Sequence, residues 1–162
     1  MSSPRTLYRA RQFWGALRPR VRASETEEAA RFLGPDLFAL FSAMTARDQR
    51  HAVDVHSRLR DGGCDDPDIL AAALLHDVGK GSRIKLWHRV VYVVLTVVHP
   101  SLVSRLRGGI ATLRDHSELG AQLLAQAAAS PEVVRLVREH ERPHRAPGDG
   151  RLAILRAADD AC

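Results

Sequence analysis

The sequence predicts an all-α protein that forms a single helical bundle. Ala, Leu, Val and Arg dominate its 162 residues and aromatic residues make up only 5%, a mixture that favours helices over sheets. Residues typical of helix N-caps recur before stretches with helical apolar spacing, and no repeat, low-complexity tract or linker divides the chain. We therefore expect one domain over 45–162, preceded by an N-terminal helical extension over 1–44 that packs on it.

The extension begins with an arginine-rich segment that has no acidic residue before Glu25. One helical face, interrupted at Pro19, would collect its apolar side chains Leu7, Trp14, Leu17 and Val21. We interpret this segment as a helix that docks on the domain, with contact to a membrane surface as the alternative.

The rest of the extension predicts two short helices. Ser24 has the capping-box spacing to Glu27, and Gly34 is placed to end the helix that they begin. Pro35 then opens the next helix, since proline is favoured at a first helical position.

The domain should start with a helix that Thr45 caps, with Asp48 at the third helical position and a turn at Gly62 as its end. The following helix opens with Asp66 as cap and Pro67 at its first position. That second helix is apolar on nearly every side, so we expect it to be buried at the centre of the domain.

The segment 82–115 is expected to be a basic and apolar insert. Its β-branched run favours a strand by propensity alone, but in an otherwise helical chain we prefer a buried or interfacial helix. The run is too short and too interrupted to span a bilayer. Its arginines are candidates for phosphate binding, with a solvated face as the alternative: Arg83, Arg89, Arg105, Arg107 and Arg114. We regard the insert as a candidate lid that sets specificity.

Three more helices are expected over 117–129, 130–140 and 151–161, the second capped by Ser130.

The net charge of +5 suits an anionic ligand such as a small phosphorylated compound or nucleic acid, and equally a solvated surface. Cys64 and Cys162 cannot build a disulfide framework, so we expect a reducing, cytoplasmic setting. Neither a secretory signal nor a membrane span is expected, and charge and composition say nothing about the oligomeric state.

Side chains that bind metals occur at helix ends or on inward faces of several predicted helices. The pair His76 and Asp77 follows the most apolar helix, which Gly79 is expected to end. His51 shares a face with Val55, and we expect that face to point inward. Three more positions belong to this pattern, at the start, end and inward face of later helices: His116, His140 and Asp159.

One such residue is more often a satisfied core histidine than a ligand, because buried polar groups are usually hydrogen-bonded. Five segments that converge on one site are best explained by a metal. Ionised carboxylate and neutral imidazole together suit Mn, Fe, Co, Ni or Zn, with Mg as a further alternative. We expect one or two divalent ions per chain.

Two neighbours compete with these candidates. His56 lies about 140° around its helix from His51, on a side that we expect to be solvent-exposed, so His51 is preferred. Asp160 shares a face with Arg156 and should be solvated or paired with it, so Asp159 is preferred. We expect His88, His99 and His144 not to be ligands, while Glu139 is a candidate acceptor from a ligand imidazole.

The order of these residues resembles the HD superfamily of metal-dependent phosphohydrolases. "AALLHDVGK" is similar to the family signature, "HSELGAQLL" to its later helix, and "LAILRAADDA" to its closing segment. The resemblance covers roughly residues 48–161 and implies an all-α fold. It implies that four residues bind one metal: His51, His76, Asp77 and Asp159. It also implies that His116 and His140 hold a second metal that Asp77 bridges.

The resemblance implies catalytic roles for Asp77 and Lys80. The lysine would bind a phosphate, although an ordinary cation at a helix end is the alternative. Relatives with two metals often have a His-His pair where this chain has Glu139 and His140, and relatives that cleave cyclic dinucleotides carry a Gly-Tyr-Pro motif. Here "HERPHRAPGDG" stands in that place, which argues against cyclic di-GMP as the substrate.

Three interpretations follow from the sequence. The preferred one is a phosphohydrolase that acts on a nucleotide or another small phosphate ester. The second is a non-catalytic module that binds a ligand or partner. The third is a dinuclear iron oxygenase, because myo-inositol oxygenase is similar in the order of its His and Asp ligands.

Overall fold

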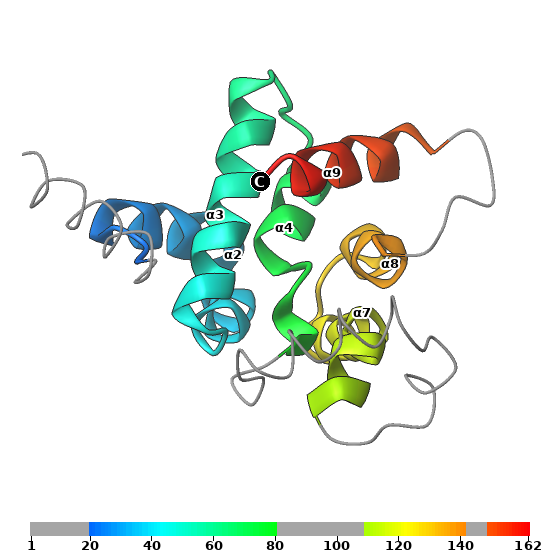
Figure 1. Ribbon diagram of the computed structural model, residues 1–162. Coiled ribbons are helices and arrows are strands. Elements are labelled where there is room, and N and C mark those ends of the chain that lie inside the picture. Colours follow the sequence, from blue (N-terminus) through cyan, green and yellow to red (C-terminus); the bar gives the residue numbers. More distant parts are fainter. Residues whose placement is uncertain (1–19, 81–108, 142–148) are drawn as a thin grey trace, which may run out of the picture.

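The computed structural model describes residues 20–80, 109–141 and 149–162, and within these ranges it contains six α-helices, one 3-10 helix and no strand (Figure 1). The all-α prediction is therefore confirmed. In chain order the elements are α2 (Ala23–Ser42), α3 (Ala46–Asp61), α4 (Pro67–Leu75), η1 (Val78–Lys80), α7 (Gly109–Gln126), α8 (Pro131–Glu139) and α9 (Gly150–Asp160). The arginine-rich segment 1–19 and the part of the expected insert before Gly109 lie outside the described residues, and residues 109–115 belong to α7.

Helix α4 lies in the middle of the bundle, where it contacts α2, α3, α8 and α9 (Figure 1). Six of its nine residues are buried apolar side chains, from Ile69 to Leu75. Each buried leucine contributes about 2 kcal/mol to folding, so a helix that is apolar all round is stable only inside the core. The predicted central position of this helix is confirmed.

Three of the helices that carry the candidate site, α3, α4 and α8, begin where the capping residues predict. Because a cap satisfies backbone N–H groups that have no partner inside the helix, it fixes the first residue of the helix and contributes about 1 kcal/mol. The three predicted caps accept backbone hydrogen bonds: Thr45 from Asp48 at 3.2 Å, Asp66 from Asp68 at 3.0 Å and Ser130 from Val133 at 3.1 Å.

The start of α2 differs from the prediction. Its N-cap is Arg22 instead of Ser24, and the backbone N–H of Arg22 donates to the Glu25 carboxylate at 2.8 Å. Arg50 of α3 binds that same carboxylate at 2.6 Å, so a tertiary ion pair selects which glutamate serves the cap. The predicted break at Gly34 is a kink inside α2, where the backbone has a φ of 72° that favours glycine.

The end of α4 also differs from the prediction. The helix ends at Leu75, with His76 as its C-cap, while Gly79 lies within η1. Gly79 is needed for a different reason: a Cβ atom there would lie 1.9 Å from the carbonyl oxygen of His116 on α7. His116 lies inside α7 and not at its start. Glycine therefore allows η1 to pack directly on the backbone of α7.

His56 corrects another expectation, since it is buried and not a surface residue. Only 7% of it is exposed, and its ring packs edge-on against Phe32 of α2 with ring centroids 5.7 Å apart. Its Nε2 atom has no hydrogen-bond partner among the described residues, and burial lowers its pKa. Helix α2 covers this side of α3, which spacing along α3 alone could not indicate.

We expect Gly79→Ala to lower the free energy of unfolding by about 3 kcal/mol or more, because the new methyl group meets backbone atoms that cannot move aside. Gly150→Ala is the matched control, since no atom lies within 4 Å of a Cβ built there. Urea unfolding of both variants tests the difference. Equal stabilities would show that η1 does not pack this closely on α7.

We expect His56→Leu to be neutral or stabilising at pH 7, because it replaces a buried nitrogen without a partner by an apolar group. The lowered pKa of His56 means that the unfolded chain binds its proton more tightly. Wild-type stability should therefore fall as the pH drops below about 6.5, and the advantage of the variant should grow. Urea unfolding at pH 7 and pH 5.5 measures this. Ser57→Ala, which removes no titratable group, should have the same effect at both pH values.

Candidate metal centre

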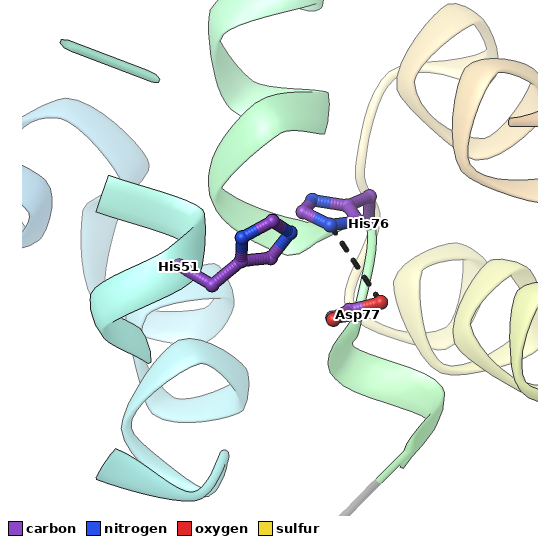
Figure 2. Close-up of side chains that lie close together, drawn as sticks. All are labelled: His51, His76 and Asp77. Atoms are coloured by element: carbon purple, nitrogen blue, oxygen red, sulfur yellow. Dashed lines mark ion pairs between the residues drawn. The ribbon is translucent and has the colours of Figure 1, made fainter. Parts of the chain in front are cut away.

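The six predicted ligand residues come together where α4 ends. His51 reaches from α3 toward His76 and Asp77, which leave the end of α4 (Figure 2). The ligand atoms of these three residues lie within 4.8 Å of one another. A second group with the same limit consists of Asp77, His116 of α7 and His140 after α8. Asp77 belongs to both groups, so the arrangement offers two adjoining places for a metal.

The imidazole rings form a continuous chain across the centre. Ring centroids lie 5.2 Å apart between His51 and His76, 5.3 Å between His76 and His140, and 5.3 Å between His140 and His116. Asp159 of α9 lies at one end of this chain. Its Oδ1 atom is 2.8 Å from Nε2 of His51 and 3.6 Å from Nε2 of His76.

Burial varies from one side of the cluster to the other. His76, Asp77 and His116 are at most 2% exposed. By contrast, the side chains of His51 and Asp159 are 30% and 29% exposed, although their helical spacing predicted burial in the core. These two residues lie at the boundary of the core, and the other four candidates lie inside it.

Two of the histidines cap the C-termini of helices. His76 donates from Nδ1 to the carbonyl oxygen of Ala73 at 2.9 Å, and His140 donates in the same way to Val137 at 2.7 Å. A carbonyl oxygen only accepts, so Nδ1 carries the proton in both rings and Nε2 presents a lone pair. The last turn of each helix therefore orients an imidazole for binding a cation and satisfies one of its own carbonyls.

The residues present fit a divalent metal. Nε2 of His76 is buried and has no hydrogen-bond partner among the described residues, although it lies 3.6 Å from carboxylate oxygens of Asp77 and Asp159. A buried group in that state costs about 1–3 kcal/mol. A cation between the lone pair and the two carboxylates would remove this cost.

The charge states also suit metal binding. Burial by itself would raise the pKa of Asp77, but His76, Lys80 and His116 around it hold that pKa well below its ordinary value. Burial lowers the pKa of His140 to about 4, so its imidazole is neutral at pH 7. An ionised carboxylate among neutral imidazoles is the donor set that Mn, Fe, Co, Ni or Zn prefers.

Two carboxylates near the cluster differ from the sequence-based expectation. Glu139, the candidate acceptor from a ligand imidazole, pairs instead with Arg135 at 3.3 Å. Glu141 is the carboxylate that lies near a candidate ligand imidazole, with an oxygen 3.5 Å from Nδ1 of His116. Its position directly after His140 was the available signal, but only the packing of α7 against α8 brings it to His116.

Lys80 ends η1, and its Nζ atom lies 2.5 Å from Oδ1 of Asp77. Its predicted phosphate contact remains a prediction.

Asp160, the competitor of Asp159, is exposed. Six other residues considered at the sequence level lie outside the described residues: Arg83, His88, Arg89, His99, Arg105 and Arg107. The same holds for His144 and for the side chain of Arg114. Within the ranges that the structure describes, no helix is long and apolar enough to cross a membrane.

Comparison with known proteins gives one family result. The family model for the HD domain matches residues 39–161. Neither a curated protein nor a solved structure gave a significant match.

The contact between His51 and Asp159 predicts a titration difference in the metal-free protein. The hydrogen bond to Asp159 raises the pKa of His51, so Asp159→Asn should lower it by removing the negative charge. Asp160→Asn is the matched control, since this neighbour is exposed and should leave His51 unchanged. NMR titration of the His51 ring measures both. An unchanged pKa in Asp159→Asn would mean that the two side chains do not meet in solution.

Proposed function

The chain belongs to the HD domain family, and from this membership we propose that it is a metal-dependent phosphohydrolase whose substrate is a nucleotide or another small phosphate ester. The observation that carries the proposal is the buried cluster of His and Asp side chains around Asp77. Nε2 of His76 is buried beside the carboxylates of Asp77 and Asp159 and has no hydrogen-bond partner among the described residues. A bound cation would supply the partner that this nitrogen lacks.

We assign the ligands in two sets. The first ion would bind His51, His76, Asp77 and Asp159. The second would bind Asp77, His116 and His140, so that one carboxylate serves both ions. The assignment is supported by the two groups of ligand atoms within 4.8 Å and by the short contacts of Asp159.

A divalent ion in such a site acidifies a water molecule toward neutral pH and polarises a phosphoryl oxygen. The protein residues have three tasks beside it. Asp77 stays ionised and supplies negative charge to both ion positions. His140 stays neutral, so it binds a cation without first losing a proton. Glu141 lies beside Nδ1 of His116, where it favours a proton on that nitrogen and leaves Nε2 for the cation.

Lys80 is the candidate for charge compensation on the substrate. Its ammonium group lies against Asp77 in this structure, and Asp77 belongs to both groups of candidate ligands. With a cation held by Asp77, Lys80 would be able to pair with the oxygens of a phosphate. A positive side chain at this position would favour anionic esters as substrates.

The first test is the metal content of freshly purified protein, measured by mass spectrometry without added metal. We expect about two transition-metal ions per chain, and about one for His140→Gln. We expect Asp77→Asn to lose both ions and at least about 100-fold in kcat/KM on p-nitrophenyl phosphate. His56→Leu removes a histidine outside the cluster and should leave metal content and activity unchanged.

Other outcomes point to the other interpretations. Iron in the protein together with oxygen consumption would favour an oxygenase. Metal binding with no hydrolysis of p-nitrophenyl phosphate or of any nucleotide in a panel would favour a binding module. No metal, and no uptake of added Mn or Fe, would overturn the enzyme proposal.

A further inference from the structure

Helix α9 lies next to α8 (Figure 1). Arg156 of α9 binds the backbone at the end of α8. Its Nε atom donates to the carbonyl oxygen of His140 at 2.7 Å, and its Nη2 atom donates to the carbonyl oxygen of Glu139 at 2.5 Å. The side chain is half-buried. Both of these contacts are to backbone carbonyl groups at the end of α8.

The end of a helix is where such a contact has most effect. The last four carbonyl groups of a helix have no partner within it, and together they carry partial negative charge. A guanidinium group is a rigid planar fork with parallel N–H groups, and here two of them bind neighbouring carbonyls. Arg156 therefore complements the negative helix end and sets where the chain leaves α8.

The residue held in this way is a candidate metal ligand. Hydrogen bonding to Val137 fixes the ring of His140 within α8, at 2.7 Å. The contact with Arg156 fixes its backbone from α9. Asp159, a candidate ligand of the other ion, lies one helical turn further along α9. One helix therefore contributes a ligand to one ion position and supports the ligand of the other.

We propose that Arg156 is a positioning residue that holds His140 in place for the second ion. The proposal rests on the proposed function, because it assumes a second ion. Partners that orient metal ligands contribute about 10–100-fold to metal affinity. A residue that acts on only one ligand should affect the second ion and spare the first.

Arg151 offers a matched control on the same helix. It ties α9 to the start of α4 through Asp66 at 2.8 Å and to the start of α8 through Glu132 at 3.4 Å. Removal of either arginine therefore weakens the attachment of α9 to α4 or α8. Only Arg156 binds the carbonyl group of His140, which separates positioning from general stability.

The test is calorimetric titration of metal-free full-length protein with Mn²⁺ for wild type, Arg156→Gln, Arg156→Lys and Arg151→Gln. We expect Arg156→Gln to weaken binding of one ion about 10–100-fold and to leave the other unchanged. Arg156→Lys keeps the charge but not the fork, and should be intermediate. Arg151→Gln should bind both ions as wild type does. Melting temperatures without metal establish that each variant is folded.

A second measurement needs no metal. Hydrogen exchange of backbone amides at residues 138–141 should be faster in Arg156→Gln than in wild type, and unchanged in Arg151→Gln. Two wild-type affinities in Arg156→Gln, or an equal loss in both Gln variants, would overturn the positioning role. Wild-type protein that binds no ion at all would overturn the proposed function itself. Wild-type protein that binds only one ion would overturn the role of Arg156, because there would be no second ion for His140 to hold.

Discussion

The site depends on one constraint, which is that α4 ends inside the protein. A helix with six buried apolar residues carries its C-terminal carbonyls into the core, where each needs a hydrogen-bond partner. His76 satisfies one of them through Nδ1 and leaves Nε2 for a cation. Asp77 then brings a carboxylate into the same buried region, and imidazoles and an ammonium group must surround it. A cation bound here would give Nε2 of His76 and the Asp77 carboxylate a partner.

The second group of candidate ligands contains a histidine that caps a helix in the same way, at the end of α8. His140 caps α8 as His76 caps α4, with the same hydrogen bond three residues back. The rings of the two capping histidines lie 5.3 Å apart between centroids. Each donates from Nδ1, so each has a lone pair on Nε2 that could bind a cation. His116 differs because it lies inside α7, and it reaches the centre only because Gly79 lets η1 pack against the α7 backbone. A side chain at residue 79 would therefore push η1 away from the α7 backbone that carries His116.

Electrostatics and burial divide the centre in a consistent way. The inner residues are held in the charge states that a metal requires, with Asp77 ionised and His140 neutral. The outer pair, His51 and Asp159, is half-exposed and joined by a hydrogen bond in the metal-free state. An ion held by both His51 and Asp159 would take the place of this hydrogen bond.

The sequence by itself determined the helical class, the central position of α4, three caps and the order of the six candidate ligands, because these features follow from local spacing and chemistry. Thr45 can be recognised as a cap, and His76 and Asp77 as a pair of ligand-type residues, from their neighbours along the chain. Only the tertiary structure decided that His56 is buried, that Glu25 serves the cap of α2, and that Glu141 and Arg156 adjoin the centre. Each of these depends on helices that are distant in sequence and adjacent in space, and the spacing of residues along one helix contains no information about which neighbour will cover it.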